Sequence, residues 1–182
     1  NHFRSFTPSA LDRFRALDAQ VGRPFPDNDV SLEAMWERWL TESWFDWESD
    51  GYPYWSHLRH FATWWRYRHL PNLLFVHFDD LLSAPEAEVR RVARFLGISI
   101  DEEAFPGLMD RISFAGMRRD FDRINPDAPA IWANGAKSFL HKGTSGQWRD
   151  VLTERDLGSY RRLVEHHLDA EAAAWLHGRA EY

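Results

Sequence analysis

The 182 residues, 44% of them apolar, can bury a substantial core as one domain, and the absence of cysteine excludes disulfides and thiolate metal sites. No apolar run approaches the roughly 18 residues of a membrane span and no signal-peptide pattern occurs, so we expect a soluble, cytoplasmic protein without stable membrane insertion. The net charge of −6, from 22 basic and 28 acidic residues, argues against a nucleic-acid-binding surface.

The first third of the chain predicts three helices. Pro8 opens a helical pattern that ends at Gly22, and breaker residues at 22–30 predict a loop. Ser31 is a good N-cap for an amphipathic helix, whose apolar residues recur at helical spacing: Leu32, Met35, Trp36, Trp39 and Leu40. A further helix is expected at about 54–67, with these residues on one face: Trp55, Leu58, Phe61, Ala62 and Trp65.

A short and nearly continuous apolar run at 73–78 (Leu-Leu-Phe-Val-His-Phe) predicts a fully buried strand of a parallel sheet. Asp79 and Asp80 mark its carboxyl end, where open α/β folds place their ligands. A single strand cannot form a sheet. We therefore expect the partner strands to lie outside this sequence, and the chain to be the second part of a larger α/β domain.

Helical patterns dominate the sequence beyond the strand. Ser83 and Glu86 have the spacing of a capping box, ahead of a helix that Gly97 closes. The remaining expected elements are, in order, a short helix at 101–111, a brief turn or helix at 113–117, an irregular stretch at 120–137, a helix capped by Thr153, and an Ala-rich segment at 171–176.

The segment 138–149, which we call the 138–149 loop, has the composition of an anion-binding loop. Within nine positions it holds two glycines, two hydroxyl residues and three potentially cationic side chains: His141, Lys142 and Arg149. Glycine lets backbone N–H groups approach an oxyanion, and lysine adds a compact positive charge. An ordinary surface turn is the alternative interpretation.

The charge distribution favours anion binding. Residues 111–149 contain seven basic and three acidic residues, a net charge of +4, which leaves a net charge of −10 for the rest of the chain. Both lysines of the protein, Lys137 and Lys142, lie in this basic region. The positive charge is therefore concentrated around the loop.

Five segments in order along the chain carry a family resemblance: Trp55-Ser56-His57-Leu58 with Thr63-Trp64-Trp65, the run at 74–81, the helix at 92–97, Ser113-Phe114-Ala115-Gly116-Met117, and the loop at 140–148. They resemble, in turn, the Trp-x-His-Val helix, the strand ending in Tyr-Glu-Asp-Leu, the Phe-Leu-Gly helix end, the Ser-Phe-x-x-Met segment and the Arg-Lys-Gly-x-x-Gly-x-Trp loop. These are motifs of PAPS-dependent sulfotransferases of the cytosolic type.

The resemblance implies an α/β, P-loop-NTPase-like sulfotransferase fold. Residues 1–182 would be the mostly helical C-terminal portion of a single domain, with one clear parallel strand. The implied activity is transfer of a sulfuryl group from 3′-phosphoadenosine 5′-phosphosulfate (PAPS) to a hydroxyl or amine of a small acceptor, without a metal. The phosphosulfate-binding loop and the catalytic base would lie outside this chain. Aromatic segments at 14–30 and 121–132 would cover the site and line part of the acceptor pocket.

The resemblance also implies the cofactor contacts. Lys142 and Gly143, with His141 in place of the family's Arg, would bind the 3′-phosphate, and Phe114 would stack on the adenine. Phe114 could instead be an ordinary core residue. Two further departures affect the adenine edge: Phe78 for Tyr and Ile112 for Thr. The family's dimer motif is altered here, which implies no dimer through the corresponding positions: Arg149, Thr153, Glu154 and Gly158.

Three other functions are open from the residues. Histidines could hold a metal, either His57 with His60 or His166 with His167 and His177, although solvated or core histidines are commoner. Residues 142–145 (Lys-Gly-Thr-Ser) could belong to a kinase or NTPase phosphate loop, but the Walker pattern is absent. The Trp-rich segment 31–47 could be the partner surface of a non-catalytic interaction module.

Overall fold

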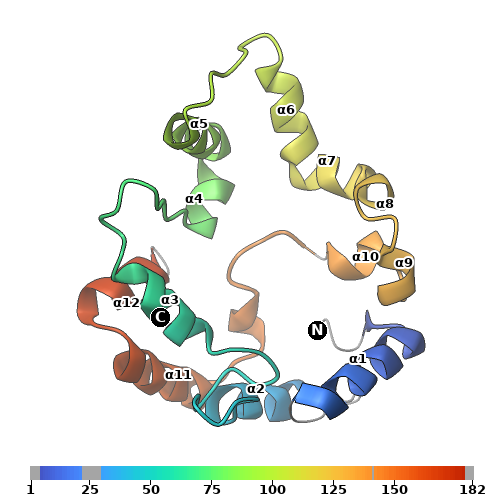
Figure 1. Ribbon diagram of the computed structural model, residues 1–182, viewed down its shortest axis with the longest axis vertical. Coiled ribbons are helices and arrows are strands. Elements are labelled where there is room, and N and C mark those ends of the chain that lie inside the picture. The colour runs from blue at the N-terminus through green and yellow to red at the C-terminus, as the bar shows by residue number, and fades with distance from the viewer. Residues whose placement is uncertain (1–4, 22–29, 141, 179–182) are drawn as a thin grey trace. The chain divides into compact units, whose positions relative to one another are not determined.

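The computed structural model describes residues 5–21, 30–140 and 142–178, and within these ranges it consists of helices and their connecting loops (Figure 1). No β-strand occurs among the described residues, where the only β-type pairing is an isolated antiparallel bridge between Phe6 and Trp132. In the same part of the chain, no helix combines the length and the apolar character needed to span a bilayer.

The chain forms two compact units, and each is described by itself. The first unit comprises Asn1–Ser56 and Arg111–Gly143, and the second comprises His57–Asp110 and Thr144–Tyr182. The boundary between Gly143 and Thr144 falls within the 138–149 loop, so the upstream and downstream halves of that loop belong to different units.

In the described residues of the first unit, the helices are α1 (Pro8–Val21), α2 (Leu32–Thr41), α7 (Phe114–Arg119), α8 (Phe121–Ile124), α9 (Ala128–Ile131) and α10 (Ala136–Phe139). The predicted first two helices are confirmed, and Ser31 caps α2 by accepting a hydrogen bond from the Ala34 N–H at 3.1 Å. The stretch expected to be irregular at 120–137 contains the short helices α8 and α9 and the start of α10.

The core of the first unit joins α1 to α9. Phe6 and Leu11 are buried, and the Phe6 ring lies 4.7 Å from that of Trp132. The Thr7 N–H donates to the Ile131 carbonyl at 2.9 Å, which fixes the start of α1 against the end of α9.

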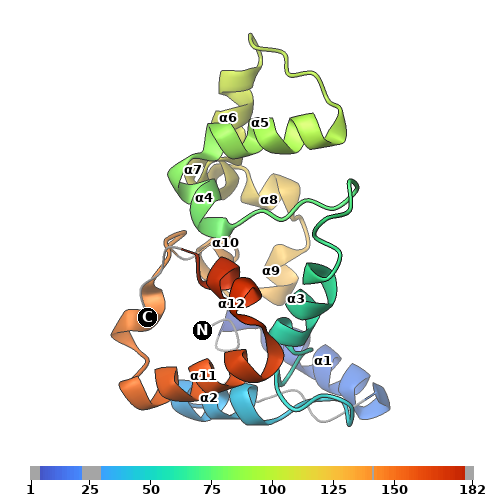
Figure 2. The same cartoon turned by 90° about the vertical axis from the view of Figure 1, so that its left-hand side faces the viewer.

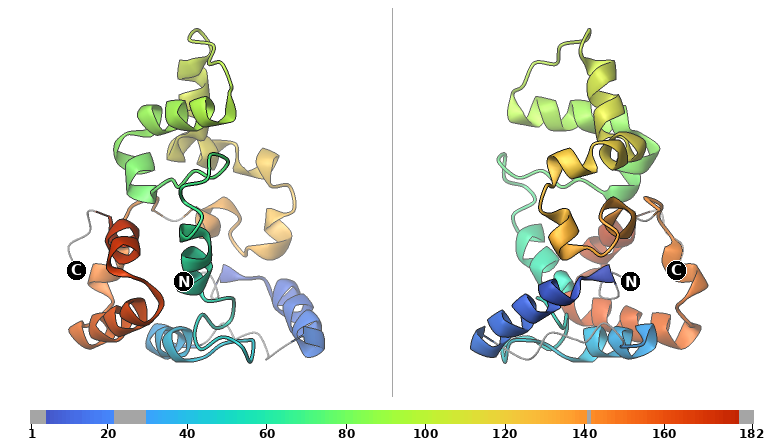
Figure 3. Two further views of the ribbon diagram at one scale, coloured as in Figure 1. Left: turned by 60° about the vertical axis from the view of Figure 1, so that its left-hand side comes forward. Right: turned by 90° about the vertical axis from the view of Figure 1, so that its right-hand side faces the viewer.

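The second unit contains these elements: α3 (His57–Trp65), α4 (Phe78–Ser83), α5 (Pro85–Leu96), most of α6 (Phe105–Ile112), the 3₁₀ helix η2 (Gln147–Asp150), α11 (Glu154–His167) and α12 (Ala170–His177). Helices α3, α11 and α12 lie side by side (Figure 2). Their core is built on Leu58, Val164 and Ala172, with the ring of Trp175 packed against it. Helices α4 and α5, both green, adjoin each other (Figure 3).

The expected strand at 73–78 is wrong. Residues 73–77 have no regular secondary structure and are half-buried, while Phe78 is 54% exposed and begins α4. A strand requires hydrogen-bonded neighbours. Here the backbone N–H groups of Leu74, Phe75 and Val76 have no acceptor among the described residues, because no neighbouring strand is present there to supply one.

The expected capping box of Ser83 and Glu86 is also wrong. Ser83 is the last residue of α4, and the N-cap of α5 is Ala84, which makes no side-chain cap. The reason is that the Ala84 N–H donates to the Asp80 carbonyl at 2.8 Å, which extends α4 through Ser83 and leaves Ala84 as the residue between the two helices. The predicted end of α5 at Gly97 is confirmed, with a left-handed φ of 68°.

The expected C-terminal helices are confirmed. Thr153 caps α11 in a capping box with Asp156, whose carboxylate accepts the Thr153 N–H at 2.8 Å. The Ala-rich segment forms α12, which begins after the N-cap Asp169. The helix expected at 101–111 begins later, at Phe105, because the Asp101 carboxylate bonds the backbone N–H groups of Glu103 and Ala104 in a turn.

Candidate functional site

The upstream half of the 138–149 loop brings Phe114 and Gly143 into contact within the first unit. The Ser113 hydroxyl accepts the Gly116 N–H at 3.0 Å and starts α7, which places Phe114 at the first helical position. Gly143 has a φ of 64°, and a Cβ at this residue would lie 2.7 Å from Phe114 Cε2. The ring therefore lies directly against the Gly143 backbone, in a space that only glycine leaves open.

Lys142 precedes this contact and is exposed. It makes no hydrogen bond or ion pair with any residue that the structure describes, so its ammonium group is available to an anionic ligand. Three of the four predicted cofactor-binding residues thus belong to the first unit, where Lys142 precedes Gly143 and the Phe114 ring contacts Gly143. The fourth, His141, lies outside the described residues.

The downstream half of the loop belongs to the second unit and is fixed by side-chain contacts. The Ser145 hydroxyl donates to Asp79 Oδ1 at 2.5 Å, and Gln147 Nε2 donates to the Thr144 carbonyl at 2.9 Å. Gly146 has a φ of 77°, a conformation that favours glycine, and leads into η2. The Arg149 guanidinium lies over the Trp148 ring, 4.7 Å from its centroid.

A cavity of about 650 Å³ adjoins this half of the loop within the second unit. Its wall includes Asp79, Ser145, Arg149, Trp175 and His177. Burial lowers the pKa of His177, which favours a neutral imidazole on this side of the cavity at pH 7. The cavity is therefore lined by one acidic side chain, Asp79, by one basic side chain, Arg149, and by aromatic rings such as that of Trp175.

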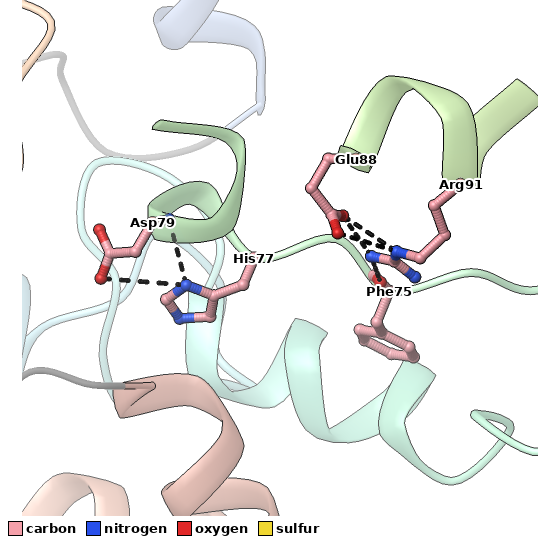
Figure 4. A network of polar contacts seen from close by, with 5 residues as sticks. All are labelled: Phe75, His77, Asp79, Glu88 and Arg91. Carbon is pink, nitrogen blue, oxygen red and sulfur yellow. Dashed lines mark hydrogen bonds and ion pairs between the residues drawn. The ribbon is translucent and has the colours of Figure 1, made fainter. Parts of the chain in front are cut away.

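His77 links the start of α4 to the end of α12 through two hydrogen bonds, and Figure 4 shows the one at the start of α4. Its Nδ1 accepts the Asp79 N–H, which leaves the proton on Nε2, and Nε2 then donates to the Leu176 carbonyl at 3.1 Å. The same nitrogen, Nδ1, lies 4.0 Å from Asp79 Oδ2. Sequence reasoning missed this role, since the only signal was a His two residues before an Asp at the end of an apolar run.

Arg91 holds the residues before His77 in place (Figure 4). Its guanidinium forms hydrogen bonds to Glu88 and donates to the Phe75 carbonyl at 2.9 Å. The bond from Arg91 lowers the pKa of Glu88 and keeps that carboxyl ionised. One carbonyl of the run at 73–77 is thus satisfied by a side chain in place of a strand neighbour.

A smaller cavity, of about 230 Å³, lies in the first unit. It is lined largely by apolar side chains, among them Phe121, Ile131, Trp132 and Phe139, and by Asn125 and Asp127. These residues include the segment 121–132 that was expected to line the acceptor pocket. Of the other segment in that expectation, 14–30, residues 14–21 belong to α1 and residues 22–29 lie outside the described residues.

The histidines weighed as metal ligands do not form a metal cluster: within the described ranges, no group of three or more His, Cys, Asp or Glu side chains is arranged to hold an ion. His57 instead stacks at 6.4 Å on the ring of Tyr160, between α3 and α11.

Comparisons with known proteins agree on one family. Residues 16–172 match the family model described as "Sulfotransferase domain". Sulfotransferase 1A1 of Rattus norvegicus is 29% identical over 101 residues, which are 55% of this chain and 35% of that protein. The glycolipid sulfotransferase of Mycobacterium bovis is 30% identical over 127 residues, which are 69% of this chain and 38% of that protein.

The fold is similar to that of a solved sulfotransferase. The crystal structure of mouse sulfotransferase SULT7A1 complexed with PAP superposes with a TM-score of 0.64 at 16% identity, over 95% of this chain and 60% of that chain. The chain spans well under half the length of the curated relatives it matches. From the family match over most of its length, the chain belongs to the sulfotransferase domain family.

Proposed function

We propose that the protein carrying this chain transfers a sulfuryl group from PAPS to a hydroxyl or amine of a small acceptor, and that this chain supplies the contacts to the 3′-phosphate and the adenine. The observation that carries the proposal is the exposed Lys142 beside Gly143, whose left-handed backbone lies against the Phe114 ring. A cation next to a glycine backbone, with an aromatic ring in contact with that glycine, suits an adenine nucleotide with an extra phosphate.

The contacts divide between the two parts of such a nucleotide. Lys142 supplies a point charge, and the peptide N–H groups around Gly143 can approach a phosphate oxygen without a side chain in the way. Phe114 is half-buried, so part of its ring stays accessible for stacking on a base. His141 is proposed as the third phosphate ligand, on the resemblance alone.

The chemistry of transfer needs groups that we assign to the rest of the domain. The bond from sulfur to the phosphate oxygen breaks as the bond to the acceptor oxygen or nitrogen forms, and a base takes the acceptor proton. We propose that residues 1–182 are the C-terminal portion of a single P-loop-like domain, whose remainder carries that base and the phosphosulfate loop. The short coverage of the curated relatives and the order of the five motifs support this division.

The acceptor side and the location in the cell are parts of the same proposal. The cavity lined by Phe121, Trp132 and Phe139 supports an apolar acceptor region in the first unit. A cytoplasmic location is supported by the resemblance to cytosolic-type enzymes, and cell fractionation would test it.

Thermal melts of the full-length protein with different nucleotides test the function. Adenosine 3′,5′-bisphosphate at a hundred times its dissociation constant should stabilise the protein by about 2.7 kcal/mol. ATP and adenosine 5′-phosphate at the same concentration should stabilise it much less, because they lack the 3′-phosphate. Equal stabilisation by all three nucleotides would overturn the proposal.

A further inference from the structure

We propose that Asp79 is a positioning residue for the 138–149 loop: it accepts the Ser145 hydroxyl hydrogen, fixes the loop downstream of Gly143, and thereby strengthens the preference for a nucleotide with a 3′-phosphate. The inference rests on the proposed function. It concerns a carboxylate that does not itself touch the nucleotide.

The contact between Asp79 and Ser145 has the geometry of a strong hydrogen bond. The two oxygens lie 2.5 Å apart although the residues are separated by 66 positions in the chain. Hydroxyl donors bound to ionised carboxylates reach this distance range and are about twice as strong as neutral pairs. Both residues belong to the second unit and line its cavity, so the bond ties the loop to the first turn of α4.

The backbone of Asp79 is itself held in place by a hydrogen bond to His77. The Asp79 N–H donates to His77 Nδ1 at 3.2 Å, and His77 Nε2 bonds the Leu176 carbonyl at the end of α12. Gly178 lies against the same imidazole, where an added Cβ would approach Cε1 to 2.7 Å. The His77 ring therefore bonds the backbone of Asp79 on one side and the end of α12 on the other, which holds the Asp79 carboxylate in position for Ser145.

The bond also decides which hydroxyl of the loop can serve a ligand. Ser145 donates its single hydroxyl hydrogen to Asp79, so it has no hydrogen left to donate to a phosphate. Thr144 is exposed, and its hydroxyl bonds no residue that the structure describes. Thr144 follows Gly143 directly, so fixing Ser145 restricts the backbone of the phosphate-binding stretch from its downstream end.

The test uses five variants of the full-length protein. Asp79→Ala and Ser145→Ala each remove the bond, and the double variant removes both partners. Asp79→Asn keeps an oxygen that can accept the hydroxyl hydrogen and is the conservative rescue. Ser83→Ala is the matched control, because Ser83 lines the same cavity but its hydroxyl bonds no residue in the described part of the chain.

Calorimetry would give the affinity of each variant for adenosine 3′,5′-bisphosphate and for adenosine 5′-phosphate, with a melt to verify folding. Each alanine variant should lose roughly tenfold in affinity for the bisphosphate, the value of a charge-assisted bond at its lower end. Affinity for the 5′-phosphate should be unchanged. The double variant should lose no more than either single one, since the two groups form one contact.

Three results would overturn the inference: an equal loss for both nucleotides, additive losses in the double variant, or failure of Asp79→Asn to restore the preference. Failure of the proposed function is distinguishable from these, because the wild type itself would then show no preference for the 3′-phosphate. If Asp79→Ala fails to fold, Ser145→Ala alone decides, since it removes the same bond from an exposed position.

Discussion

Lys142 and Phe114 should contribute to nucleotide binding through different forces. Lys142→Ala removes a charge-assisted contact to a phosphate, at a cost of about 1.5 to 3 kcal/mol, and should leave binding less dependent on salt. Phe114→Ala removes stacking on the base, at a cost of roughly 1 to 3 kcal/mol, with the salt dependence unchanged. Titration calorimetry at two salt concentrations would separate the two effects.

The nucleotides provide the control for this pair. Lys142→Ala should bind adenosine 5′-phosphate as well as the wild type does, whereas Phe114→Ala should weaken every adenine nucleotide alike. A loss of 5′-phosphate affinity in Lys142→Ala would contradict the assignment of Lys142 to the 3′-phosphate.

Gly143 and Gly146 form a matched pair for a second prediction. Both have positive φ, of 64° and 77°, so alanine at either costs about 1 to 2 kcal/mol of backbone strain. At Gly143 the new Cβ would also meet the rigid Phe114 ring at 2.7 Å, whereas at Gly146 it would meet only the end of the flexible Arg149 side chain. Gly143→Ala should displace the ring and reduce bisphosphate affinity by about tenfold or more, the value of one stacked base.

Gly146→Ala is the control in the same titration. Its melting temperature should fall by the amount that backbone strain alone predicts, and its bisphosphate affinity should fall less than that of Gly143→Ala. Equal losses of affinity in the two variants would show that the left-handed backbone, and not the ring contact, is what the ligand requires.

Among the elements, α11 offers a pH-dependent cap. Thr153→Ala should destabilise the protein by about 1 kcal/mol at pH 7, because it removes the hydroxyl that caps the helix. Hydrogen bonds from Thr153 lower the pKa of Asp156 below its ordinary value of 3.8. The contribution of Asp156 is therefore present above that value and is lost as the pH falls through the lowered pKa. Melts from pH 7 downward should show the effect of Thr153→Ala shrinking in acid.

Ser31→Ala is the matched control for this prediction. Ser31 caps α2 through its hydroxyl, and the third helical position there is Ala34, which has no carboxylate to titrate. Its effect on the melting temperature should be the same across this pH range. A pH dependence of equal size in both variants would contradict the role of Asp156.

The run at 73–77 gives a prediction for hydrogen exchange. In residues 1–182 alone, the backbone N–H groups of Leu74, Phe75 and Val76 should exchange quickly, because they have no acceptor among the described residues. The N–H of Val164, which is buried and lies in the interior of α11, is the internal reference for slow exchange. The same three groups should become protected in the full-length protein if neighbouring strands pair with them. Slow exchange in the shorter chain would contradict this.

The difference between what the sequence predicted and what it missed follows from the range of the interactions. The caps at Ser31 and Thr153 and the helix end at Gly97 depend on residues within a few positions, so the pattern predicts them. A strand depends on partners far away in the chain, and the strand expected at 73–78 does not form because no neighbouring strand is present among the described residues. The bond from Ser145 to Asp79 spans 66 positions, and no local signal announces it.

At the scale of the whole molecule, we expect no dimer through the segment Arg149 to Gly158. The Arg149 guanidinium lies over Trp148, and Gly158 lies within α11 with open space around it, where an added Cβ would meet only Arg162 Nη1 at 3.8 Å. Gly158→Ala should therefore stabilise the helix by about 0.5 to 1 kcal/mol. Sedimentation velocity should give the same state of association for the wild type and for Gly158→Ala. Cross-links between copies of the protein at this segment would contradict the expectation.

The unpaired run at 73–77 has a consequence for how the protein must be made. Four of its five residues are apolar, two of them, Phe75 and Val76, favour strands, and it contains no proline or glycine, which are features of segments that pair with copies of themselves. Asp79 and Asp80 follow it closely and act as charged gatekeepers against such stacking. If strands of the complete domain pair with this run, expression together with the segment that carries them should raise the soluble yield of residues 1–182.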